Sequence, residues 1–136
     1  MSSIVEILNL IRDEFSVFND PRDKYIFLVD LAKDLGGLTE EEKVEANRIH
    51  GCTSQAWVTC KKNNSKYFFK TDSDAMIVRG LLSLIERSFN DHTKEEILNI
   101  DGSQFLDSVG LGRSISSQRT NGFSNAINKI QKELLD

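Results

Sequence analysis

Apolar residues recur every three or four positions near both ends of the chain, which is the spacing of one face of an α-helix. In the N-terminal segment the residues on this face are Ile4, Leu8, Ile11, Phe15 and Phe18. A second helix is expected to start at Pro21, because Asp20 is a favourable N-cap residue and proline suits the first helical turn. Gly36 and Gly37 are expected to end this helix near residue 35.

In the middle of the chain the pattern changes to the alternation that is typical of a β-strand. The alternating sets are Ala56, Val58 and Cys60 on one side and Gln55, Trp57 and Thr59 on the other. A polar turn at residues 62–65 and an aromatic run at 66–70 complete an antiparallel hairpin over residues 54–70. A broad apolar face then predicts a central helix, with Asp72, Ser73 or Asp74 as its cap.

Two capping-box sequences, at residues 39–42 and 93–96, predict shorter helical turns. Another short segment covers residues 104–109, and a long last helix follows it. The apolar face of the last helix consists of Phe123, Ala126, Ile127, Ile130 and Leu134. These elements predict a single α+β domain over residues 1–136, in which helices from both ends of the chain pack against a small antiparallel sheet.

The charge balance narrows the choice of partners. Seventeen basic and 21 acidic residues give a formal net charge of −4, which argues against nucleic acid or an anionic membrane surface as the partner. No apolar run approaches the roughly 20 residues that span a bilayer, and the sequence from Met1 lacks the features of a signal peptide. The expected protein is cytoplasmic and binds a protein or a small molecule.

Cys52 and Cys60 are the only cysteines in the sequence. Their spacing fits neither a C-x-x-C redox pair nor a zinc knuckle, so no disulfide framework, metal site or resident cofactor is expected. Cys52 directly follows Gly51 and precedes the first strand, which favours a nucleophile on an accessible loop. The alternative is a buried thiol that serves only as a small apolar group. Cys60 is expected to lie in the core, on the strand face of Ala56 and Val58.

Residues 51–57 read GCTSQAW and resemble the G-C-x-S-x-x-W signature of the SufE family. Three further blocks, at residues 72–81, 93–98 and 117–122, appear in the order that the family shows. The resemblance spans nearly the whole chain, and it implies a SufE/IscU-like fold.

The resemblance also implies a function. Cys52 would accept persulfide sulfur from a pyridoxal-phosphate-dependent cysteine desulfurase of the SufS type, enhance the activity of that enzyme, and pass the sulfur to an iron–sulfur scaffold of the SufB type. The protein would then be a carrier rather than an enzyme, and a monomer or a weak homodimer. In the free protein the Cys52 side chain is expected to turn inward against an apolar pocket and to swing out when the desulfurase docks.

Other residues receive supporting roles. Gly51, Ser54 and Gln55 are expected to shape the loop around the thiol. Arg119 belongs to the block that the family keeps near this loop, so it either contacts the desulfurase or holds the loop, unless it is a solvated first-turn arginine. Asp74 is interpreted first as a helix cap and second as a docking residue.

The histidines and two other classes of function offer alternatives. His50 lies two positions from Cys52, on the same side of an extended segment, and is a candidate base. His92 is expected to be an exposed loop residue. The alternative functions are a scaffold that binds iron itself, for which two cysteines supply few ligands, and a self-sufficient thiol enzyme, for which no orienting third group is recognised.

Overall fold

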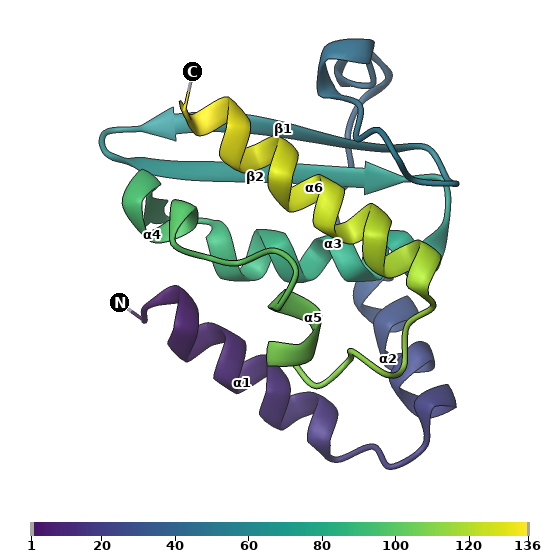
Figure 1. Cartoon of the computed structure of the whole chain (residues 1–136). Helices are drawn as coiled ribbons and strands as arrows, with labels where there is room; N and C mark the ends of the chain where they lie inside the picture. The colour runs from purple at the N-terminus through teal and green to yellow at the C-terminus, as the bar shows by residue number, and fades with distance from the viewer. Residues whose placement is uncertain (1, 136) are drawn as a thin grey trace.

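The computed structural model describes residues 2–135, and Figure 1 shows its arrangement. In chain order the elements are α1 (Ile4–Ser16), α2 (Pro21–Lys33), the short 3₁₀ helices η1 (Glu40–Glu42) and η2 (Glu45–Asn47), β1 (Ala56–Asn63), β2 (Lys66–Ser73), α3 (Met76–Phe89), β3 (His92–Thr93), α4 (Lys94–Leu98), α5 (Phe105–Ser108) and α6 (Ser117–Leu135). The predicted α+β fold is confirmed.

Local side-chain caps set the start of several helices. The hydroxyl of Ser3 and the carboxylate of Glu6 form a reciprocal capping box at the start of α1. Asp20 accepts a hydrogen bond from the backbone N–H of Arg22 at 2.9 Å, directly before Pro21. Both predicted capping boxes are also present, at η1 and at α4. The helix α2 ends at Lys33, two residues before the position predicted from the two glycines.

The sheet is antiparallel and has the strand order β1-β2-β3. The pairing of β1 with β2 runs from Ala56 opposite Ser73 to Asn63 opposite Lys66, so only Asn64 and Ser65 form the turn. Strand β2 is therefore three residues longer than predicted. Because Asp72 and Ser73 are strand residues, the prediction that one of them is the N-cap of α3 was wrong, and that position is taken by Ala75.

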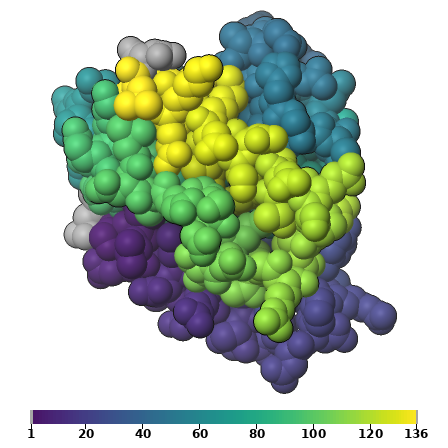
Figure 2. Space-filling view, in the orientation of Figure 1, coloured from purple at the N-terminus to yellow at the C-terminus, as the bar shows by residue number. Residues whose placement is uncertain are grey.

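Helix α3 is the centre of the molecule. It packs against β2 on one side and against α1 and α2 on another, while α6 crosses in front of α3 and the sheet (Figure 1). Figure 2 shows α6 at the surface, between the blue segment before β1 and the green segment of α4 and α5.

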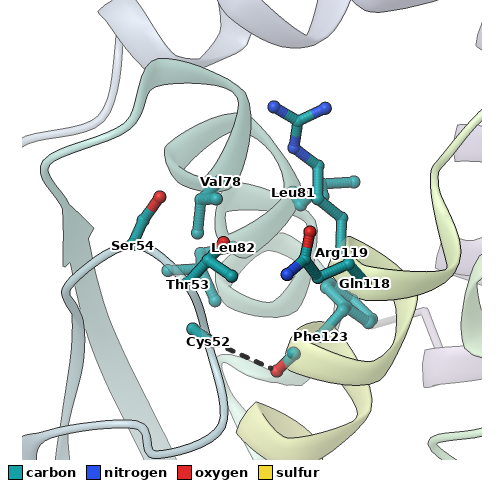
Figure 3. A pocket seen from close by; sticks show the side chains of 10 residues that line it. Cys52, Thr53, Ser54, Val78, Leu81, Leu82, Gln118, Arg119 and Phe123 are labelled. Atoms are coloured by element: carbon teal, nitrogen blue, oxygen red, sulfur yellow. Dashed lines mark hydrogen bonds between the residues drawn. The ribbon is translucent and has the colours of Figure 1, made fainter.

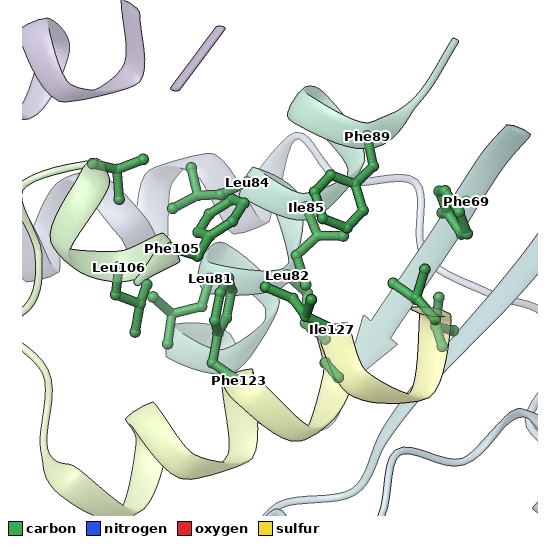
Figure 4. Close-up of a cluster of buried hydrophobic side chains, with 14 of the residues drawn as sticks. Phe69, Leu81, Leu82, Leu84, Ile85, Phe89, Phe105, Leu106, Phe123 and Ile127 are labelled. Carbon is green, nitrogen blue, oxygen red and sulfur yellow. The ribbon is translucent and has the colours of Figure 1, made fainter. Parts of the chain in front are cut away.

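Four phenylalanine rings connect the sheet to α6 through the core (Figure 4). The centroid distances are 6.2 Å from Phe69 to Phe89, 6.1 Å from Phe89 to Phe105 and 5.0 Å from Phe105 to Phe123. Each pair is tilted or edge-to-face, the geometry that aromatic rings prefer. This series joins β2, α3, α5 and α6, and it holds α3 and α6 in fixed positions relative to each other.

Candidate functional site

Cys52 lies on a loop between η2 and β1, and its side chain faces a pocket between α3 and α6 (Figure 3). The Cys52 loop, residues 50–55, contributes Thr53 and Ser54 to the rim of this pocket. The pocket holds about 350 Å³ of empty space, part of it open to solvent. Its other lining residues are Val78, Leu81 and Leu82 of α3 and Gln118, Arg119, Gly122 and Phe123 of α6.

The thiol of Cys52 is half-buried and donates a hydrogen bond to the backbone carbonyl oxygen of Gly122, with Sγ and O 3.5 Å apart. Burial raises the pKa of the Cys52 thiol, because the apolar walls disfavour the thiolate. A carbonyl oxygen accepts a hydrogen bond only from the protonated sulfur. The free protein therefore holds Cys52 as a neutral thiol that is turned toward an apolar pocket.

Hydrogen bonds to neighbouring elements close the stem of the Cys52 loop. At its start, the N–H of Ile49 donates to the carbonyl oxygen of Ala56 at 2.8 Å. At its end, the N–H of Gln55 donates to the carboxylate of Asp74 at 3.1 Å, and the N–H of Asp74 donates to the carbonyl oxygen of Gln55 at 3.2 Å. Asp74 thus supports the loop and is not the N-cap of α3, which was its first interpretation; its second interpretation, as a docking residue, stays a prediction. The side chain of Gln55 is exposed.

Gly51 allows the Cys52 loop to turn against α6. Its φ is +88°, in the left-handed region, and a Cβ atom there would lie 2.1 Å from Nδ2 of Asn125. Only glycine meets both conditions without strain. Gly51 therefore directs the next residue, Cys52, toward the pocket.

His50 is directed away from the thiol. It is exposed, and its Nε2 lies 3.0 Å from Oε1 of Glu45. With Gly51, Asn125 and Lys129 it lines a separate, open hollow along α6. The geometry gives no support to His50 as a base for Cys52.

Arg119 lies in the first turn of α6 at the mouth of the pocket. Its guanidinium carbon is 6.0 Å from the centroid of the Tyr25 ring. Figure 3 shows that the Arg119 side chain extends away from Cys52. The residue is exposed. Arg119 is thus placed to contact a molecule that reaches the pocket, and its side chain is not hydrogen-bonded to the loop.

Two sequence predictions near the sheet were wrong. Cys60 is exposed, because burial along edge strand β1 is confined to its first residues, Ala56 to Val58, and the strand is exposed from Cys60 onward. His92 is buried with an exposed fraction of 2%, because it lies in β3, where it pairs with Tyr67 of β2. Its ring nitrogens lie 2.9 Å from the carbonyl oxygen of Asn90 and 2.8 Å from that of Ser2.

The contact between Gly122 and the Cys52 thiol was not predicted from the sequence. The available signal was an isolated glycine inside a helical pattern, which usually has a packing reason.

Within residues 2–135, no three side chains of His, Cys, Asp or Glu are grouped so that they could hold a metal ion. None of the helices described here has the length and apolar character that crossing a membrane requires.

Comparisons with known proteins agree with the resemblance. Residues 9–134 match the model of the SufE family, described as an Fe-S metabolism associated domain. The chain is 33% identical over 130 residues to an uncharacterized SufE-like protein of Rhizobium etli, covering 93% of this chain and 88% of that protein. It is also 33% identical over 123 residues to one of Synechocystis, covering 90% of this chain and 77% of that protein.

A solved structure supports the fold alone. The solution structure of a hypothetical protein from Thermus thermophilus superposes with a TM-score of 0.78 at 18% sequence identity. The match covers 95% of this chain and 93% of that one.

Proposed function

This chain belongs to the SufE family, whose members have a role in Fe–S metabolism, and we propose that within this role Cys52 accepts sulfur from the persulfide of a cysteine desulfurase. The observation that carries the proposal is the half-buried Cys52 thiol, placed on a loop and directed into an apolar pocket. The donor would be a SufS-like, pyridoxal-phosphate-dependent enzyme in the cytoplasm. The recipient would be an iron–sulfur scaffold of the SufB type.

The transfer is a thiol exchange that needs no outside oxidant. The Cys52 thiolate attacks the outer sulfur of the donor's persulfide. The sulfur–sulfur bond of the donor breaks, its cysteine leaves as a thiolate, and a new sulfur–sulfur bond forms on Cys52. Removal of the outer sulfur frees the desulfurase for its next cycle, so the protein enhances the activity of that enzyme as a carrier.

The pocket suits a carrier because the two stages of its work make opposite demands. During transfer the thiol must be reached by another protein and must ionise. Between transfers the sulfur must be kept from reductants in solution, and the apolar walls at Leu81, Leu82 and Phe123 would shield it from polar ones. Movement of the Cys52 loop between these two situations meets both demands.

Several residues would serve docking. The Cys52 loop would be held by Gly51, Gln55 and Asp74 in a conformation that a partner can displace from the pocket. Ser54 would border the path of the thiol as it leaves the pocket. Arg119 would contact the desulfurase from the rim of the pocket, since its guanidinium is exposed there.

The test is to incubate the protein with a SufS-like desulfurase and free cysteine and then to measure intact and peptide masses. We expect the Cys52 peptide to gain about 32 Da, the mass of one sulfur atom, while the Cys60 peptide is unchanged. The Cys60→Ser variant is the matched control and should behave as wild type, because Cys60 is exposed and lies outside the pocket. If Cys52→Ser still enhances sulfide production as wild type does, the proposal fails.

A further inference from the structure

Gly122 of α6 lies directly against the sulfur of Cys52. A Cβ atom at this position would be 2.9 Å from Sγ of Cys52 and 3.6 Å from both its Cα and its Cβ. Real Cβ atoms are not found 2.9 Å from a sulfur, so the sulfur occupies space that exists only because residue 122 has no side chain. Glycine is disfavoured inside a helix, which makes its presence at this contact informative.

The backbone of the same residue also contacts the thiol. The carbonyl oxygen of Gly122 accepts the Cys52 S–H at 3.5 Å. A thiolate in this place would face the negative end of the carbonyl dipole and would have no proton to donate. The contact therefore favours the neutral thiol, in the same direction as burial does.

We propose that Gly122 is a positioning residue for Cys52. Its missing side chain seats the sulfur in the pocket, and its carbonyl oxygen holds the thiol proton. This inference concerns the sulfur-accepting site, and its biological meaning rests on the function proposed above. The contact itself belongs to the isolated protein and is tested there.

The surroundings of the thiol do not offset this effect. From α3 the pocket receives only Val78, Leu81 and Leu82, which are uncharged. From α6 the charged side chain at the pocket is Arg119, whose guanidinium lies by the ring of Tyr25. From its own loop Cys52 is flanked by Thr53 and Ser54, which carry no charge.

The substitution Gly122→Ala separates the two partners of this contact. The new methyl group takes the place of the sulfur, and the sulfur rotates away because it is the free end of a short side chain. Helix α6 is retained, since alanine is the most favourable helix former. The thiol is thereby moved out of the pocket and away from the Gly122 carbonyl.

The experiment is alkylation of the isolated protein by iodoacetamide between pH 6 and 10, with Cys52 and Cys60 quantified as separate peptides in one sample. In Gly122→Ala we expect the Cys52 rate near neutral pH to rise about fivefold, because access and ionisation both increase. The pH midpoint of the Cys52 rate should shift downward, a change that a merely structural role of Gly122 would not produce. Exposed Cys60 is the internal reference.

Gly36→Ala is the matched control, because a Cβ atom at residue 36 has nothing within 4 Å. It should leave the Cys52 rate and its pH midpoint unchanged. An unchanged rate and midpoint in folded Gly122→Ala would overturn the proposal.

A second measurement covers the case in which Gly122→Ala does not fold. In the Cys60→Ser variant the infrared S–H stretching band comes from Cys52 alone, and in Cys52→Ser it comes from exposed Cys60 alone. We expect a Cys52 band that is narrower than the water-broadened Cys60 band and lies below the frequency of a thiol without a hydrogen bond; a Cys52 band at the frequency of a thiol without a hydrogen bond would overturn the proposal. Neither readout includes a desulfurase, so failure to form the persulfide would count against the proposed function and leave this result standing.

Discussion

Gly51 determines where the neighbouring thiol points. Its left-handed φ and the absence of a side chain next to Asn125 let the chain turn at the surface of α6. Two residues in the site are thus glycines for different reasons, because Gly51 satisfies a backbone angle and Gly122 leaves room for a sulfur. The position of the Cys52 thiol depends on both, although neither glycine has a reactive group.

Replacing Gly51 by alanine should destabilise the protein by about 1–2 kcal/mol, because both the positive φ and the contact with Asn125 are unfavourable for a Cβ atom. Urea unfolding followed by tryptophan fluorescence measures the change. The double variant Gly51→Ala/Asn125→Ala should recover only part of the loss, since the backbone angle stays strained. Full recovery would show that the backbone angle costs nothing.

At the scale of elements, the junction of β2 and α3 fixes the segment that follows α2. The Asp72 carboxylate accepts hydrogen bonds from the N–H of Leu38 at 3.0 Å and of Ser73 at 2.8 Å. It is also paired with Arg79 at 3.2 Å and Lys43 at 3.4 Å. Burial acts to raise the pKa of Asp72, but these donors and cations outweigh it and lower the pKa below the ordinary value of 3.8.

This shift predicts a pH dependence of stability. Since the folded pKa of Asp72 is below the unfolded one, its contribution is complete above pH 3.8 and is lost as the pH falls from 3.8 through the folded pKa. Asp72→Asn should lower the free energy of unfolding at pH 7 by about 1–3 kcal/mol and should lose less stability than wild type on acidification. Urea unfolding at several pH values from 7 to 2 measures both. Asp13→Asn, at an exposed position on α1, should match wild type.

Elements with local signals could be predicted from the sequence, and those set by long-range pairing could not. Asp20-Pro21 and the two capping boxes specify their helix starts through contacts within three residues, and these were found. The end of β2 depends on Ser73 pairing with Ala56, and the burial of His92 depends on Tyr67. The position of Cys52 on a loop could be predicted from the sequence. Its contact with Gly122 could not, because the two residues are 70 positions apart.

At the scale of the whole molecule, the phenylalanine series makes the core a single unit. Phe105 touches both Phe89 and Phe123, so the short helix α5 connects α3 to α6. The ring of Phe105 is almost fully buried, with an exposed fraction of 1%. The base of the pocket therefore depends on a side chain that does not line it.

Phe105→Ala should reduce the free energy of unfolding by about 3–5 kcal/mol, because it removes a buried ring and leaves a cavity. Thermal and urea unfolding measure the loss. Val17→Ala is the control, since Val17 is 72% exposed and its truncation should change stability by less than about 0.5 kcal/mol. A similar small effect for both variants would contradict the central place of Phe105.

The closed stem of the Cys52 loop limits how far the sulfur can travel. The bonds of Ile49 with Ala56 and of Gln55 with Asp74 leave only the residues between them free to lift. An extended chain of this length spans roughly 20 Å, so its midpoint rises at most about 10 Å above the stem. Under the proposed function, a donor that keeps its persulfide deeper than this reach would have to open or present it at its own surface. The length of the loop thus sets how far Cys52 can extend into a partner.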